Sequence, residues 1–156
     1  MSARGWLAVR VALTVIVVAG LAIDAYVHFH VAFGYEKVQS SVLNEAQLFR
    51  AEGAVAALVA LALLARPRRY TAALAFLVTA GGAFAVLLYY YVNVGAFGPF
   101  PNMYEHVWYT EKTLSAWAEG IAALAALALL IVMHVRVRRT TDTAAERGKT
   151  SVQLSG

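Results

Sequence analysis

The sequence contains no cysteine and few charged residues. The absence of cysteine from all 156 residues excludes disulfide bonds, thiol catalysis, iron–sulfur ligation and thiolate metal sites. Charged side chains make up 14% of the chain, whereas soluble domains carry about 25%. The hydrophobic share is 61%, and a soluble domain of this size could not bury so much apolar surface. These features indicate an integral membrane protein.

Long apolar runs predict an all-α fold, a four-helix transmembrane bundle with up-down topology. A transmembrane helix needs about 20 predominantly apolar residues. Runs of that length lie at residues 11–33, 46–65, 70–92 and 114–135. Only Arg66-Pro67-Arg68-Arg69 separates the second run from the third, so these helices must be antiparallel neighbours. The first run could instead be a cleaved signal peptide, but it is long enough to span the membrane.

These runs define one domain and a tail. We expect residues 1–137 to form the four-helix transmembrane domain. The segment 138–156 is polar, carries charges of both signs and lacks hydrophobic periodicity. We therefore expect it to be a disordered cytoplasmic tail.

The basic residues predict the orientation of the bundle. The formal net charge is +4. The basic residues at one end of the runs are Arg4, Arg10, Arg66, Arg68, Arg69, Arg136, Arg138, Arg139, Arg147 and Lys149. Only Lys37, Arg50 and Lys112 lie toward the other end. Because cytoplasmic loops carry an excess of Lys and Arg, we predict a multi-pass protein of the cell membrane with both termini in the cytoplasm. The same distribution marks topology and not a nucleic-acid-binding face.

Short motifs recur between the two halves of the chain. Ala19-Gly20 in the first run is matched by Ala80-Gly81 in the third, and Glu52-Gly53 in the second by Glu119-Gly120 in the fourth. We predict a tandem repeat of two-helix units, related by an axis along the membrane normal. The alternative is that Ala- and Leu-rich helices resemble one another by composition alone.

Acidic residues lie at a similar depth in three of the four runs. Counted from the nearest basic residue at the predicted cytoplasmic end, Asp24 and Glu52 each lie about 14 residues into the membrane, roughly 21 Å along a helix. Glu119 lies about 17 residues in, roughly 25 Å. A charge at the centre of a span costs about 2.5–3.5 kcal/mol. We therefore expect these carboxylates to face the bundle interior and to share a pocket in the outer half of the membrane.

Other polar residues at this depth complete the predicted pocket. His28 lies four residues after Asp24 and shares its helix face. Arg50 is expected to pair with Asp24 or Glu119, and the third run ends near this level. The predicted pocket residues are Asp24, His28, Arg50, Glu52, Tyr89, Asn93 and Glu119. The alternative is that these charges only fix helix packing.

A metal or haem site is a further alternative at the same depth. Its ligands or acid–base groups would come from Asp24, His28, Glu52, Glu119 and His106, of which His28, His106 and Glu52 are the candidate metal ligands. The sequence contains no Glu-x-x-His spacing, which argues against a di-iron centre. A bis-His haem would need a second buried histidine, and only His106, in a predicted loop, is near enough. No catalytic residue is identified, and a non-catalytic role is favoured over an enzyme.

One stretch of the sequence has a pattern of residues that is similar to that of a known protein family. Glu52 opens the second run, the basic turn Arg66-Pro67-Arg68-Arg69 follows, and the third run is rich in Ala and Leu. With this pattern the stretch Arg50–Gly82, about a fifth of the chain, resembles the DoxX-like family of small four-helix membrane proteins. The resemblance implies association with membrane redox complexes, some of which pass electrons to quinone, and a polar-site role for Glu52. His28 and the Tyr89–Tyr91 run do not map onto that family.

The expected function combines the pocket with this resemblance. We expect an accessory or ligand-binding subunit of a membrane redox system, with a quinone or a lipid in the pocket. Its expected partners are the lipid bilayer together with a membrane redox protein or a second copy of the chain. The alternatives are a metal- or haem-binding membrane oxidoreductase and a purely structural membrane protein.

Overall fold

The computed structural model describes residues 2–36 and 42–153, with side chains described up to residue 135 except that of Ala3. Within these residues the chain forms α1 (Ala3–Ala32), α2 (Glu45–Ala65), α3 (Arg69–Tyr91) and α4 (Thr110–Gln153). Each of these helices is long and apolar enough to span a membrane. The chain is therefore an all-α, four-span membrane protein, as the apolar runs predict.

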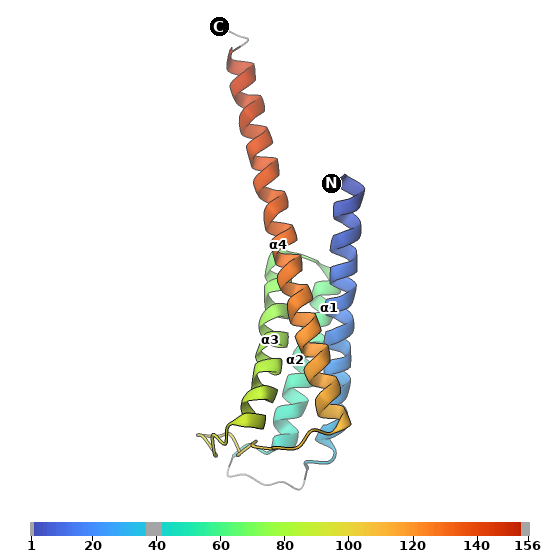
Figure 1. Ribbon diagram of the computed structural model, residues 1–156, viewed down its shortest axis with the longest axis vertical. Coiled ribbons are helices and arrows are strands. Elements are labelled where there is room, and N and C mark those ends of the chain that lie inside the picture. Colours follow the sequence, from blue (N-terminus) through green and yellow to red (C-terminus); the bar gives the residue numbers. More distant parts are fainter. Residues whose placement is uncertain (1, 37–41, 154–156) are drawn as a thin grey trace.

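The helices pack as an up-down bundle (Figure 1). The chain termini and the α2–α3 turn lie at one end, which we name the terminal end. The α1–α2 and α3–α4 connections lie at the other, which we name the loop end. α1 packs closely against α2 and α4, and α3 packs closely against α4, whereas α2 and α3 pack less closely against each other. The bundle is thus tightest around α1 and α4.

The helix boundaries differ from the predicted runs mainly where polar residues extend a helix. α1 begins eight residues before the first apolar run, at a Ser2 N-cap whose side chain accepts a hydrogen bond from the Gly5 amide. α4 begins four residues before the fourth run and continues to Gln153. Side chains beyond residue 135 and all of residues 154–156 lie outside the described part of the chain, so the disorder expected for 138–156 stays a prediction.

Hydrogen bonds to main-chain carbonyls hold the terminal end together. The Arg66–Arg68 turn is closed by Thr71, whose hydroxyl accepts from the Arg68 amide (3.0 Å) and donates to the Arg66 carbonyl (2.8 Å). The Arg10 guanidinium donates to the Pro67 carbonyl, and that of Arg69 donates to the Met133 carbonyl. These bonds tie α1 and α4 to the turn between α2 and α3.

Small residues allow the close approach of α1 to its neighbours. A Cβ on Gly20 would lie only 2.6 Å from the Ala122 Cβ of α4. A Cβ on Gly53 of α2 would lie 3.2 Å from the Ala25 carbonyl oxygen of α1. The larger apolar side chains of the bundle mostly face outward, toward lipid. The bundle is therefore held by close packing of small residues, as is usual where lipid removes the hydrophobic drive between helices.

Candidate functional site

Asp24 of α1 and Glu119 of α4 meet inside the bundle. Their side chains are 1% and 0% exposed, respectively. The Ser115 hydroxyl, one turn before Glu119, lies 3.0 Å from Asp24 Oδ1 and 3.2 Å from Glu119 Oε1. It carries a single proton, so it donates to one carboxylate at a time. A serine on α4 thus bridges acidic side chains from two helices.

His28 joins this pair from α1. Its Nδ1 lies 2.8 Å from Asp24 Oδ1 and 3.0 Å from the Asp24 carbonyl oxygen. A carbonyl oxygen can only accept, so Nδ1 carries a proton and donates it to Asp24. In a neutral ring, Nε2 is then the nitrogen with a free lone pair. The ring packs against Phe49 of α2, with centroids 5.7 Å apart. Asp24, His28, Ser115 and Glu119 together form what we name the acidic cluster.

Gly82 of α3 makes room for the Glu119 carboxylate. A Cβ at position 82 would lie 2.6 Å from Glu119 Oε1 and 3.0 Å from Oε2. A Cβ on the neighbouring Gly81 would meet nothing within 4 Å. The Glu119 carboxylate therefore lies directly against the α3 backbone, and α1, α3 and α4 all contribute to its surroundings.

Two oxygens of the acidic cluster lack a hydrogen-bond partner among the described residues. They are Asp24 Oδ2 and Glu119 Oε2, and both are buried. A buried polar atom without a partner costs about 1–3 kcal/mol, and more when it is charged. A proton, a water molecule or a cation at these two oxygens would therefore stabilise the cluster.

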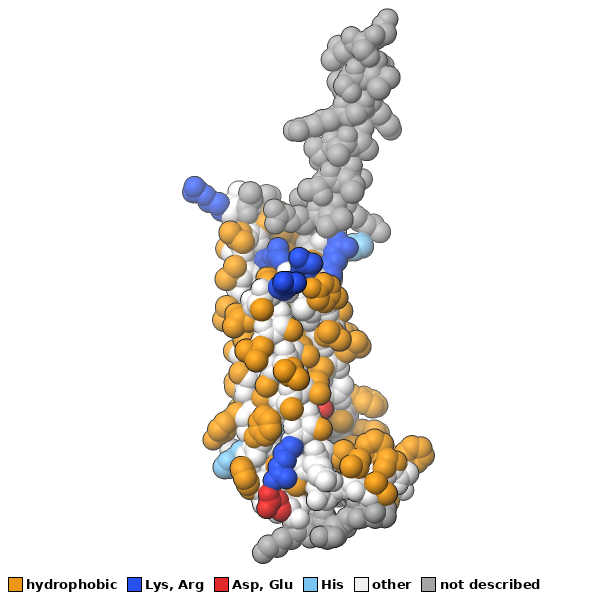
Figure 2. Space-filling model, turned by 180° about the vertical axis from the view of Figure 1, so that it is seen from behind, with side chains coloured by type: hydrophobic (Ala, Val, Ile, Leu, Met, Phe, Trp, Pro, Cys, Tyr) orange, Lys and Arg blue, Asp and Glu red, His pale blue; other side chains and the backbone are white. Residues whose placement is uncertain are grey.

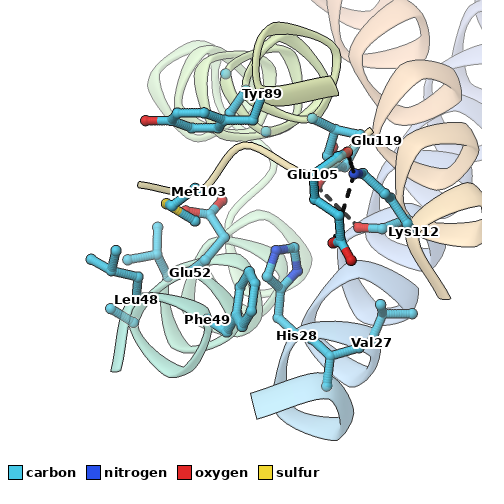
Figure 3. A pocket seen from close by; sticks show the side chains of 18 of the residues that line it. Val27, His28, Leu48, Phe49, Glu52, Tyr89, Met103, Glu105, Lys112 and Glu119 are labelled. Atoms are coloured by element: carbon cyan, nitrogen blue, oxygen red, sulfur yellow. Dashed lines mark hydrogen bonds and ion pairs between the residues drawn. The ribbon is translucent and has the colours of Figure 1, made fainter. Parts of the chain in front are cut away.

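A cavity of about 410 Å³ is lined by residues of the acidic cluster and by residues of the α3–α4 connection at the loop end, several of which are labelled in Figure 3. His28 from α1, Glu52 from α2, Tyr89 from α3 and Glu119 from α4 all line it. Its other walls are mainly apolar and include Leu48, Phe49, Val55, Val86, Phe100 and Met103. The cavity thus joins an apolar chamber to polar groups from all four helices.

Residues exposed on the outside of α2 and α3 also line the cavity. Val55 of α2 lines the cavity and is 44% exposed. Gly81 of α3 also lines it and is exposed, with open space where a Cβ would stand. The cavity wall on this side lies between α2 and α3, which pack less closely than the other neighbouring helices.

A polar and aromatic group borders the cavity at the loop end. Lys112 Nζ donates to the Glu105 carbonyl (2.6 Å) and lies 3.9 Å from the Glu105 carboxylate (Figure 3). The Tyr35 hydroxyl donates to Glu105 Oε2 (3.2 Å) and lies 3.4 Å from that of Tyr109. Burial raises the pKa of both tyrosines, and the Glu105 carboxylate raises it further. Both hydroxyls therefore stay protonated at neutral pH.

Three residues predicted for the pocket or for a metal site lie elsewhere. Arg50 forms an ion pair with Glu36 on the surface, so its expected pairing with Asp24 or Glu119 is wrong. An exposed carboxylate at the loop end is available to Arg50 without burying its guanidinium. The Asn93 side chain is exposed and accepts from the Gly95 amide (3.1 Å).

His106 also lies outside the acidic cluster. It is exposed in the α3–α4 connection, where its ring stacks on Tyr90 with centroids 4.5 Å apart. Its Nδ1 lies 2.9 Å from the Tyr90 carbonyl oxygen. The residues whose ligand atoms gather closely enough for a metal ion are instead Asp24, His28 and Glu119, within 4.8 Å of one another.

Comparison of the chain with protein-family models, curated proteins and solved structures finds no match. The DoxX-like resemblance therefore stays a prediction, and function must be argued from the site itself. The acidic cluster can exchange protons, hold a cation, or bind the polar group of a ligand lying in the cavity. Ser115 and Gly82, which shape the cluster, are absent from the predicted site.

Replacing Ser115 with alanine tests the bridge between α1 and α4. We expect Ser115→Ala to lower the free energy of unfolding by about 1–3 kcal/mol, because the single donor that Asp24 and Glu119 share in a buried site would be lost. Thr113→Ala is the matched control, since its exposed hydroxyl donates only to the Tyr109 carbonyl. Denaturant unfolding in detergent measures both variants, and equal stability would contradict the bridge.

Proposed function

We propose that this protein is a non-catalytic membrane subunit that binds an amphipathic ligand, a quinone or a lipid, in the cavity beside the acidic cluster. The observation that carries the proposal is a chamber with mainly apolar walls that ends on buried polar groups and is lined between α2 and α3 by residues also exposed on the outside of the bundle. A ligand dissolved in the membrane can enter such a chamber without crossing water.

The size and lining of the cavity suit such a ligand. Small-molecule pockets typically measure about 300–1,000 Å³ and combine apolar walls with a few polar groups that fix orientation. Here Leu48, Val55 and Val86 supply apolar walls, while Glu52 and Glu119 supply acceptors. The ligand's apolar part would extend between α2 and α3, and its polar group would lie near the acidic cluster.

The mixture of donors and acceptors favours a quinone-like head group. Lys112 and the protonated hydroxyl of Tyr109 border the cavity and can donate to a carbonyl oxygen. Glu52 and Glu119 can accept from a hydroxyl, the form such a head group takes when reduced. A redox partner in the membrane would match this ligand and the implication of the DoxX-like resemblance, and a second copy of this chain is the other proposed partner.

Tryptophan substitutions at the α2–α3 opening test ligand binding. Val55→Trp places an indole in the cavity and is expected to reduce the co-purified ligand at least tenfold, because the bulk occupies its space. Leu58→Trp is the control, since Leu58 lies on the same helix, is 66% exposed and does not line the cavity. Mass spectrometry of organic extracts from purified protein measures the ligand.

The outcomes of this experiment separate the alternatives. A quinone or a specific lipid retained by the wild type and by Leu58→Trp, but lost from Val55→Trp, supports the proposal. Extracts that match bulk membrane lipid in all three proteins would contradict it. They would favour instead the structural alternative, in which the acidic cluster only fixes helix packing.

We also propose that the terminal end faces the cytoplasm and that the two helix hairpins arose by duplication. Figure 2 shows Lys and Arg side chains gathered at the terminal end of the apolar surface. An excess of basic residues marks the cytoplasmic side. The duplication is supported by Glu52 and Glu119, which open the matching Glu-Gly steps and line the same cavity.

Cysteine labelling tests the orientation, and the cysteine-free wild type provides the blank. We expect a membrane-impermeant maleimide to label Phe97→Cys in intact cells, because Phe97 is exposed at the loop end. Ser2→Cys, at the terminal end, should be labelled only after permeabilisation. The reverse pattern would place the termini outside the cell.

A further inference from the structure

We propose that Asp24, His28 and Glu119 bind a divalent metal ion, with Zn²⁺ the ion that fits these ligands, at the inner end of the cavity. This goes beyond amphipathic-ligand binding, because it depends only on side chains of α1 and α4. All three residues belong to the wider set that the sequence offers as ligands or acid–base groups, from which the structure leaves out Glu52 and His106.

The three side chains already lie near coordination distance. One ring nitrogen of His28 and one carboxylate oxygen from each acid lie within 4.8 Å of one another. Zn²⁺ binds nitrogen and oxygen at about 2.0–2.2 Å, which sets ligand atoms of a tetrahedral site roughly 3.4 Å apart. No pair of ligand atoms therefore needs to close by more than about 1.4 Å to reach that geometry.

The unpartnered oxygens point independently to a cation. Asp24 Oδ2 and Glu119 Oε2 belong to side chains that are 1% and 0% exposed, and neither has a hydrogen-bond partner among the described residues. The other oxygen of each carboxylate lies within hydrogen-bond distance of the Ser115 hydroxyl, which donates to one of them at a time. Ser115 therefore orients both groups and leaves one lone-pair-bearing oxygen of each acid for a ligand.

The charge of the acidic cluster is matched better by a divalent ion than by the neighbouring basic side chains. Two ionised carboxylates with a neutral His28 carry a charge of −2, which a divalent ion cancels. Lys112 is directed to Glu105, and Arg50 is paired with Glu36 at the surface. Glu52 of α2 adds a third acidic side chain to the same cavity. Within the bundle an uncompensated charge is costly, so a matching cation stabilises the cluster.

The ligand set leaves a coordination position open. Three protein ligands on a Zn²⁺ ion leave a fourth position for water or another ligand. The cavity lies beside His28 and Glu119, so this position can be filled from the chamber. The proposed ion would then be accessible to the polar group of a cavity ligand.

Calorimetric titration tests the site on the full chain, purified in detergent and freed of metal with a chelator. We expect Zn²⁺ to bind with 1:1 stoichiometry. His28→Ala and Glu119→Gln should each weaken binding at least tenfold. His106→Ala is the control for the exposed histidine and should leave the affinity unchanged. Co²⁺ as a second probe should give visible absorption bands that are lost in His28→Ala.

Two adjacent glycines provide variants that retain every ligand. Gly82→Ala should weaken Zn²⁺ binding because the added methyl group displaces the Glu119 carboxylate, which lies 2.6 Å from that position. Gly81→Ala adds the same group in open space and should bind as the wild type does. This pair keeps the test valid even if His28→Ala or Glu119→Gln fails to fold.

The results distinguish this proposal from ligand binding in the cavity. Absence of saturable binding, or binding lost in His106→Ala but kept in Glu119→Gln, overturns the metal site. Neither result affects the retention of a quinone or lipid, which is measured separately. An acidic cluster that binds no metal would be neutralised by protons alone.

Discussion

The structure depends on the need to keep two carboxylates out of the hydrocarbon. Asp24 and Glu119 lie on different helices, and both are enclosed in the bundle. This arrangement is achieved because Gly20 lets α1 approach α4, Ser115 bridges the two acids, and Gly82 admits the Glu119 carboxylate against α3. Small residues at the helix contacts therefore make room for the buried carboxylates as well as allowing close packing.

The same constraint explains where the bundle is open. The acidic cluster and the close contacts fix α1, α3 and α4 relative to one another, while α2 and α3 lie further apart. The cavity forms on this less tightly packed side, with the acidic cluster at its inner end and the Glu105–Lys112 group at its loop end. The polar site inside the protein thus lies next to the least tightly packed pair of neighbouring helices.

Much of this architecture follows from the sequence, because apolar run length and short turns are local signals. The number of residues between each acid and the nearest basic residue also predicts that Asp24 and Glu119 lie at a similar depth. Their contact follows from the cost of exposing them to lipid. The predicted position of Arg50 in the pocket is wrong because the depth of a residue does not determine which way its side chain faces. Glu36 provides an ion-pair partner for Arg50 at the surface. Ser115 had a usable signal, since it lies four residues before Glu119 on one helix face. Gly82 had none, because its role depends on how α3 packs against α4.

A double-mutant cycle on Asp24→Asn and Glu119→Gln tests the central contact most directly. The two single variants and the double variant are unfolded with denaturant in the same detergent. Neighbours in one hydrogen-bond network show coupling energies of about 0.5–3 kcal/mol, so a coupling of at least about 1 kcal/mol is expected. Additive effects, with coupling indistinguishable from zero, would show that the two acids do not interact and would remove the basis of the proposed site.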